Sequence, residues 1–219
     1  MIDYLLKYPD KLLKAFVGHI EIVLITLVIS IVLAALLTIL TAYSKIASKL
    51  LINIFAMIYS IPSLALFAIL VPLTGLGKVT AIIVLVLYNQ YILLRNTIDG
   101  LNNVDVYIIE AATGMGMNKS QILFQVKLPL VTRPIFAGIH LAVVSTIGIA
   151  TIAASINAGG IGSILLDGLR TVNTVKILWG TLMSAGLAII VNGMLNVIEK
   201  KFIKITPEGS TIYIKKGLN

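Results

Sequence analysis

The chain has 219 residues, of which 58% are hydrophobic and only 12% are charged, a composition too apolar for one ordinary soluble domain. It contains no cysteine, which excludes disulfide frameworks, thiolate zinc sites, iron–sulfur clusters and cysteine nucleophiles. The net charge of +8 would suggest a nucleic-acid partner for a soluble protein, but here the basic residues lie between apolar runs, as in loops held against anionic lipid.

The amino-terminal segment carries Lys7, Lys11 and Lys14 on one helical face, and leucines supply apolar surface beside them. Pro9 interrupts this pattern, so we expect a short interfacial helix with a break, lying on the bilayer. The apolar run that follows is too long for the core of a signal peptide and lacks a cleavage context. It is therefore interpreted as a retained membrane span.

Five stretches without Asp, Glu, Lys or Arg approach or exceed the roughly 20 apolar residues that a membrane-crossing helix needs. They predict an all-α integral membrane protein with spans at about residues 20–44, 50–72, 78–96, 134–156 and 177–198. The second stretch is punctuated by Pro62 and Pro72, and the third is short, although Lys78 and Arg95 extend its reach by snorkelling. Residues 1–205 then form one transmembrane domain, and residues 206–219 form a short cytoplasmic tail.

The distribution of Lys and Arg predicts the orientation of these spans. One side carries Lys45, Lys49, Arg95, Lys119, Lys127, Arg133, Lys200, Lys201, Lys204, Lys215 and Lys216. The other side carries Lys7, Lys11, Lys14, Lys78, Arg170 and Lys176. The richer side should be cytoplasmic, which places the amino terminus outside, the carboxyl terminus inside, and the long loop of residues 97–132 in the cytoplasm.

That cytoplasmic loop is strongly patterned. It reads Glu110-Ala-Ala, then three residues, then Gly, and after nine further residues Val126-Lys-Leu-Pro129. This spacing resembles the loop signature of the permeases of binding-protein-dependent ATP-binding-cassette (ABC) importers, with Val126 in place of the usual Ile. The alternative interpretation is an ordinary amphipathic surface helix that ends at a proline. Such a helix would not require the complete spacing from Glu110 to Pro129.

The resemblance covers about residues 20–198. It is strongest for the permeases that import glycine betaine, carnitine, choline and related osmoprotectants, through the stretches Ser60-Ile-Pro-Ser-Leu-Ala, Arg95-Asn-Thr and Asn157-Ala-Gly-Gly-Ile-Gly162. Family members often carry a proline ahead of the Arg-Asn-Thr element, whereas this chain has Tyr91-Ile-Leu-Leu94. The bend of the third span is therefore expected to differ here.

The resemblance implies a type I ABC importer permease fold with a coupling loop that docks on a cytoplasmic ATPase. The residues it assigns to coupling are Glu110, Ala111, Ala112, Gly114, Gly116, Leu128 and Pro129. Small side chains permit close backbone approach, Gly116 can take the positive φ that ends a helical turn, and Leu128-Pro129 should stop the next helix. The implied partners are ABC ATPase subunits that carry ATP and Mg, a second permease copy or paralogue, and an extracellular solute-binding protein in a bacterial cell membrane.

Polar residues within the spans are candidates for a translocation path, because such groups are costly in lipid. They are Tyr59, Ser60, Ser63, Asn89, Gln90, His140, Ser145, Thr146, Thr151 and Ser155. For His140 an interior histidine with satisfied hydrogen bonds is favoured over a substrate ligand. A second candidate is an outer gate or hinge formed by Asn157, Gly159, Gly160 and Gly162, although an ordinary glycine stop followed by a short helix explains this segment slightly better.

Other functions find little support in the residues. The chain has no Gly-x-x-x-x-Gly-Lys-Ser/Thr phosphate loop, so it should not hydrolyse ATP itself, and no cofactor site is expected. Glu110 and Asp105 are expected on the loop and not in a pocket, so they do not suggest an enzyme. An ABC permease for an amino acid such as methionine remains an alternative, as does an ion-driven carrier or channel, which should bury charged residues in its spans.

Overall fold

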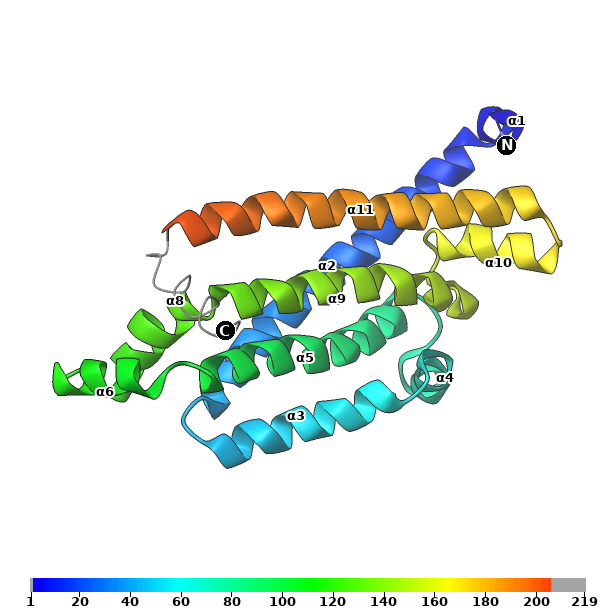
Figure 1. The fold of residues 1–219 in the computed structure, drawn as a ribbon. Coiled ribbons are helices and arrows are strands. Elements are labelled where there is room, and N and C mark those ends of the chain that lie inside the picture. Colours follow the sequence, from blue (N-terminus) through cyan, green and yellow to red (C-terminus); the bar gives the residue numbers. More distant parts are fainter. Residues whose placement is uncertain (1, 206–219) are drawn as a thin grey trace, which may run out of the picture.

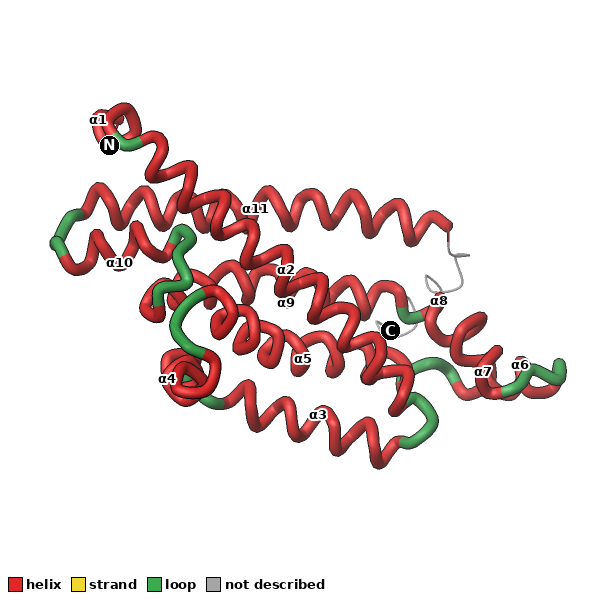
Figure 2. Tube along the Cα trace, turned by 180° about the vertical axis from the view of Figure 1, so that it is seen from behind, coloured by secondary structure: helices red, strands yellow, loops and turns green. Residues whose placement is uncertain are grey.

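The computed structural model describes residues 2–205, and all regular structure in that range is helical (Figures 1 and 2). The elements are α1 (Ile2–Lys7), α2 (Pro9–Thr41), α3 (Lys45–Ser60), α4 (Ser63–Thr74), α5 (Lys78–Asn102), α6 (Val106–Gly114), α7 (Lys119–Gln121), the π-helix η1 (Ile122–Lys127), α8 (Leu128–Leu130), α9 (Thr132–Ile152), the 3₁₀-helix η2 (Ala153–Ile156), α10 (Gly162–Arg170) and α11 (Thr174–Ile205). The prediction of an all-α membrane protein is confirmed. The tail of residues 206–219 lies outside the described residues.

Four segments in the described range are long and apolar enough to cross a membrane: α2, α5, α9 continued by η2, and α11. The helices α3 and α4 pass the same test only together, and they are bent by 97° at the break between them. Pro62 explains the break, because a proline disfavours helical backbone at the preceding residue and Ile61 is accordingly extended (φ −70°, ψ 131°). The predicted five spans are therefore four straight helices and one broken pair.

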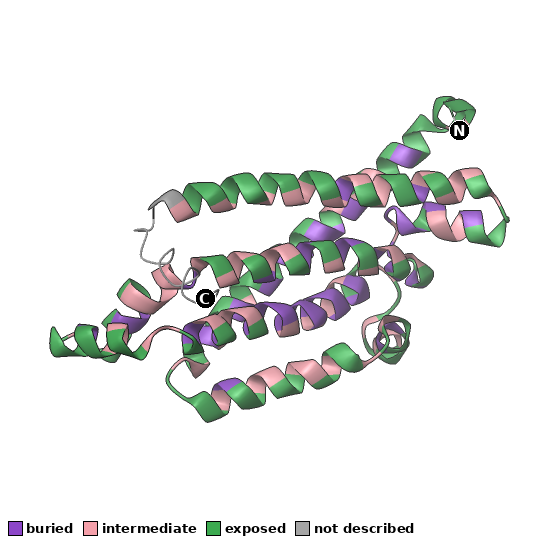
Figure 3. Ribbon diagram, in the orientation of Figure 1, coloured by how far each residue is buried: buried purple, intermediate pink, exposed green. Residues whose placement is uncertain are grey.

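The helix α5 lies at the centre of the molecule and packs against α2, α3, α4 and α9 (Figure 1). Its most apolar window is 61% buried, whereas that of α11 is only 6% buried, a contrast that Figure 3 shows as purple against green. Leu94 from α5 and Ala142 and Ile147 from α9 are among the most buried residues of the main hydrophobic core. The side of α11 turned away from α9 and α10 is apolar and therefore suited to lipid or to a second transmembrane chain.

Two helices extend further than the apolar runs predicted. A break at Tyr8 separates α1 from α2, and Pro9 occupies the first turn of α2, where its missing N–H is not needed. A short interfacial helix with a break at Pro9 was expected ahead of the first span; the chain is interrupted at Tyr8, but the residues after the break continue directly into the helix of the first span. The third predicted span also continues beyond residue 96, since α5 is one unbroken helix that includes Tyr91 to Leu94 and ends at Asn102.

Candidate coupling and translocation site

The segment after α5 folds into a helical hairpin that projects from one end of the molecule, while α1 and α10 lie at the other end (Figure 1). Asp105 starts α6, since its carboxylate accepts a hydrogen bond from the Tyr107 N–H at 2.9 Å. The helix ends at Gly114; two residues later Gly116 has φ +80°, and the Met117 N–H donates to the Ala112 carbonyl at 3.1 Å. The predicted positive φ at Gly116 is confirmed, and it closes the helix with a reversal that suits glycine.

The second arm of the hairpin begins with a reciprocal cap. Asn118 and Gln121 each accept a hydrogen bond from the other's backbone N–H, at 2.9 and 2.8 Å, and so start α7. The helix then widens into the π-helix η1 and continues through α8. The prediction that Leu128-Pro129 stops this helix is wrong, because Pro129 lies in the first turn of α8 and the chain turns at Val131 (φ −98°, ψ 16°). The wider π turn ahead of Pro129 leaves room for its ring.

The small residues of the hairpin divide into two groups. Ala112 is buried, with 2% of its surface exposed, where α6 packs against η1. Ala111, Gly114 and Gly116 are exposed, and a Cβ at either glycine would meet nothing within 4 Å. Glu110 is also exposed, and large apolar side chains lie near it, including Tyr107 and Met115, which are 74% and 76% exposed. The hairpin thus presents an apolar, small-residue surface of the kind that marks a protein-binding site.

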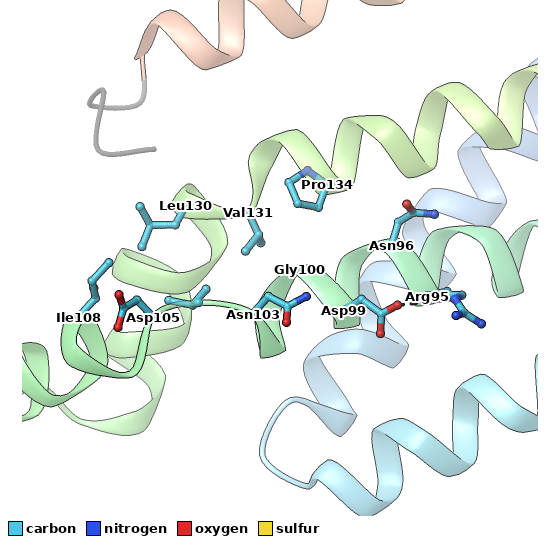
Figure 4. Close-up of a pocket in the computed structure, with 11 residues that line it drawn as sticks. Arg95, Asn96, Asp99, Gly100, Asn103, Asp105, Ile108, Leu130, Val131 and Pro134 are labelled. Carbon is cyan, nitrogen blue, oxygen red and sulfur yellow. Dashed lines mark ion pairs between the residues drawn. The ribbon is translucent and has the colours of Figure 1, made fainter. Parts of the chain in front are cut away.

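A cavity of about 680 Å³ lies at the base of the hairpin, between the end of α5 and the start of α9 (Figure 4). Arg95 and Asp99 from α5 line it, together with Asn103 directly after that helix, Asp105 and Pro134. Asp105 was predicted to lie away from any pocket, and that prediction is wrong, because its cap position at the start of α6 faces this space. The cavity is a polar-edged opening where the spans meet the hairpin.

Several predicted path residues instead hold the helices together. Asn89 is 1% exposed, and its amide donates to the Thr146 hydroxyl at 2.9 Å and to the Ser30 hydroxyl at 3.3 Å. Gln90 is fully buried and donates to the Ser30 carbonyl at 3.2 Å. Ser30 on α2 was not singled out from the sequence, although it is a polar residue within the first predicted span. These residues join α2, α5 and α9 and are closed to solute within this chain.

We predict that Asn89→Leu destabilises the helical core, because the change removes the side-chain hydrogen bonds that Asn89 makes with the buried hydroxyl groups of Ser30 and Thr146. The expected cost is about 1–2 kcal/mol. A thermal unfolding scan of the detergent-solubilised protein should show a clear fall in the midpoint. Ser155→Ala is the matched control, since Ser155 is exposed and its loss should leave the midpoint unchanged. An unchanged midpoint for Asn89→Leu would contradict the structural role of this network.

His140 also serves a helix contact. Its ring nitrogens lie 2.5 Å from Asn192 Oδ1 and 3.1 Å from Glu199 Oε2, so α9 is tied to α11 at two points. Glu199 was missed because it follows directly after the predicted last span. The signal that could have found it is spacing, since Asn192 and Glu199 are two helical turns apart and share one face.

The remaining path candidates differ in access. Ser145 and Ser63 are half-buried, and Thr151 donates to the Gly148 carbonyl of its own helix at 2.7 Å. Tyr59 and Ser60 are exposed beside the break between α3 and α4. Tyr59 is therefore a polar aromatic residue whose side chain reaches the surface of this chain.

The predicted outer segment is compact and not an open loop. Asn157, Gly159 and Gly160 have φ of +64°, +81° and +72°, and His19 lies directly under Gly160. Gly162 starts α10 against the backbone of Thr151. These residues fold the chain back from η2 into α10, which agrees with the ordinary glycine stop more closely than with a free gate.

The helix α10 is anchored by Asp167. Its carboxylate lies 2.9 Å from Lys11 Nζ and 3.1 Å from Lys176 Nζ, which joins α10 to α2 and α11. The hydrogen bonds from Lys11 and Lys176 hold the pKa of this carboxyl below its usual range. Among the described residues 2–205, no group of three histidine or acidic side chains is arranged to hold a metal ion.

A broken-span helical membrane fold with a projecting helix-turn-helix defines a class of transport components. The sequence pattern of the family described as "Binding-protein-dependent transport system inner membrane component" matches residues 27–204, and the chain belongs to this family. It is similar to the Bacillus subtilis choline transport system permease protein OpuBB, with 34% identity over 209 residues that cover 95% of each chain.

Two further similarities extend this result. The Bacillus subtilis glycine betaine/carnitine/choline transport system permease protein OpuCB is also 34% identical over 209 residues, again 95% of each chain. Among solved structures, an inward-facing MetNI methionine ABC transporter chain matches with a TM-score of 0.72 and 18% identity, over 90% of this chain and 96% of that one. At that identity the structural match shows the fold alone, which is the predicted type I importer permease fold.

Proposed function

We propose that this chain forms the translocation pathway for a quaternary-ammonium osmoprotectant, such as glycine betaine, carnitine or choline. Family membership supports a permease role, and the full-length relatives at 34% identity are named for these solutes. An amino-acid permease of the methionine type has less support, because the methionine transporter is matched at only 18% identity. The single observation that carries the proposal is the match to these relatives over 95% of each chain. The hairpin surface, which is exposed among the described residues 2–205, supports a contact with a separate partner.

We further propose that the hairpin docks on separate ATPase subunits, which bind ATP and Mg, and that an extracellular binding protein delivers the solute. The exposed apolar side chains of α6 support the first contact. ATP-driven closure of the ATPase pair would then move the hairpins and switch the path between its two openings. Two permease copies, or this chain and a paralogue, would enclose that path.

The proposal is tested by reconstituting the permease with its ATPase in proteoliposomes. ATP with the loaded binding protein should drive accumulation of labelled betaine, and omission of either should abolish it, because solute recognition resides mainly in the binding protein. An amino acid should not accumulate under the same conditions. Tight betaine binding by the permease and ATPase alone would contradict this division of labour.

We also propose that the hairpin faces the cytoplasm and that α10 lies outside, which places the basic excess inside. Lys119 on the hairpin and Arg170 at the end of α10 are both exposed and belong to opposite ends of the molecule (Figure 1). The chain has no cysteine, so single cysteines report cleanly. In intact cells, an impermeant thiol reagent should label Arg170→Cys and spare Lys119→Cys, and the reverse pattern would refute this topology.

A further inference from the structure

Three tyrosines from two helices cluster beside the break between α3 and α4. The ring of Tyr59 lies 4.9 Å from that of Tyr91 and 5.6 Å from that of Tyr88, centre to centre. The Tyr88 hydroxyl donates to the Ile61 carbonyl at 2.6 Å, the group that the Pro62 break leaves without a helical partner. Tyr88 is 3% exposed and therefore supports the break, whereas Tyr59 is 39% exposed. The cluster thus has a buried base and an open aromatic face.

A charged pair continues this cluster along α5. Arg95 lies one turn beyond Tyr91; its Nη1 donates to the Tyr91 hydroxyl at 2.9 Å, and its guanidinium carbon lies 5.9 Å from the centre of that ring. Asp99 follows one turn later, 3.6 Å from Arg95, and both side chains are more than half exposed. Arg95 and Asp99 also line the cavity at the base of the hairpin. Aromatic rings, a guanidinium and a carboxylate therefore form one continuous stripe that ends in a cavity.

The position of the stripe argues against a lipid-facing role. With a rise of 1.5 Å per residue, Tyr91 lies about 20 Å from one end of α5 and about 16 Å from the other, near the middle of this candidate spanning helix. Charged groups on spanning helices face protein or water and not lipid. The Arg95–Asp99 pair has no partner on another helix of this chain within the described range. The stripe must therefore face a second subunit or a water-filled path.

The chemistry of the stripe matches a solute with two opposite charges. A quaternary ammonium has no N–H to donate, so ring faces attract it through their negative electrostatic potential. A carboxylate pairs with the fork of donors on a guanidinium, and Arg95 uses few of its five N–H groups here. The position of Arg95 above Tyr91 already places a cation over one ring of the cluster. A purely cationic amine would gain the aromatic contact but would be repelled by Arg95.

We infer that Tyr59, Tyr91 and Arg95 form a contact site on the translocation path for zwitterions that combine a quaternary ammonium with a carboxylate. The ammonium group lies against the exposed ring of Tyr59, and the carboxylate pairs with Arg95. Asp99 lowers the net charge of the stripe, so the solute is held weakly and can leave through the cavity. This inference rests on the proposed function and specifies which solutes the path favours.

The test compares uptake of glycine betaine, a zwitterion, with uptake of choline, a cation, by the complete reconstituted transporter. Each uptake rate is divided by the fraction of binding protein loaded with that solute, so that the preference of the binding protein is removed. Arg95→Gln should lower the betaine-to-choline ratio about five- to tenfold, the loss expected for one charge-assisted contact. Arg95→Lys, which keeps the charge, should retain most of the ratio.

The aromatic half of the site is tested with a matched pair of variants. Tyr59→Leu should reduce the corrected uptake of both solutes about three- to tenfold, whereas Tyr59→Phe, which keeps the ring, should stay close to wild type. An unchanged ratio in Arg95→Gln, or equal behaviour of Tyr59→Leu and Tyr59→Phe, would overturn the inference. A merely structural defect would slow both solutes without altering their ratio. If the wild-type transporter carries neither solute, the proposed function fails instead.

Discussion

Gly116→Trp is expected to abolish ATP-driven uptake while the protein still inserts in the membrane. Gly116 is exposed at the tip of the hairpin, and a Cβ there would meet nothing within 4 Å in this chain. A large side chain would therefore clash only with a docked partner. Overpacking a tight interface costs roughly 1–3 kcal/mol or more, and each 1.4 kcal/mol weakens association about tenfold.

Backbone strain must be separated from that clash, because Gly116 has φ +80° and other residues resist this conformation by about 1–2 kcal/mol. Gly116→Ala adds strain with little bulk. Gly114→Trp adds bulk with little strain, since Gly114 also has open space around it but no positive φ. Uptake and binding-protein-stimulated ATP hydrolysis should be lost in both tryptophan variants and largely kept in Gly116→Ala.

Glu110→Lys should weaken the same coupling by reversing an exposed charge next to this surface. If the hairpin were instead a freely solvated helix pair without a partner, all these variants should show wild-type uptake. Substitutions on such a surface usually change the free energy of unfolding by less than about 0.5 kcal/mol. Normal uptake by Gly116→Trp and Gly114→Trp at normal expression would therefore remove the hairpin from the coupling mechanism.

Gly162→Ala is expected to cause the largest loss of stability among glycine-to-alanine changes within residues 2–205. An added Cβ would lie 2.8 Å from the Thr151 Cα and closer still to the Thr151 carbonyl. Both are backbone atoms, so no side chain can rotate away, and α10 would have to move from its place against the end of α9. We expect a cost of about 3 kcal/mol or more.

The matched control for this change is Gly148→Ala in α9, where a Cβ would meet nothing within 4 Å. Replacing glycine with alanine inside a helix is favourable by about 1 kcal/mol, so this control should be neutral or slightly stabilising. Thermal unfolding in detergent compares the two variants directly. A Gly162→Ala midpoint equal to that of Gly148→Ala would mean that the close approach of α10 to Thr151 is not maintained in solution.

Charge-free runs predicted where the helices are, but they could not show how far each one extends. The limit set at residue 96 assumed that Arg95 marks a membrane edge, whereas Arg95 and Asp99 lie on the exposed face of a helix that continues to Asn102. The second stretch was noted as punctuated by Pro62 and Pro72, but the 97° bend was not predicted, and the hydrogen bond from Tyr88 to Ile61 that supports it comes from another helix. Local sequence carries no information on such distant partners.

Among the coupling and path residues, too, some features follow from local sequence and others depend on distant partners. The φ of Gly116 follows from local chemistry, because glycine is the residue that ends helices with this conformation at little cost. The burial of Asn89 does not follow from local chemistry, since an amide in an apolar run can face either a pore or a neighbouring helix. Only the position of Ser30 and Thr146 decides between them. Glu199 was overlooked for a related reason, because its partner His140 comes from another helix.

The helix α2 runs without a break from Pro9 to Thr41. Its 33 residues give a length of about 50 Å, whereas the hydrocarbon core is about 30 Å thick, so roughly 20 Å of the helix stands beyond it. The ion pair between Lys11 and Asp167 fastens the protruding part to α10. If α2 tilted by about 10° around the point where it leaves the hydrocarbon core, its protruding end would move by about 3 Å, by the geometry of a straight helix. We therefore expect that a small tilt of α2 inside the bilayer would move its protruding end, and α10 with it.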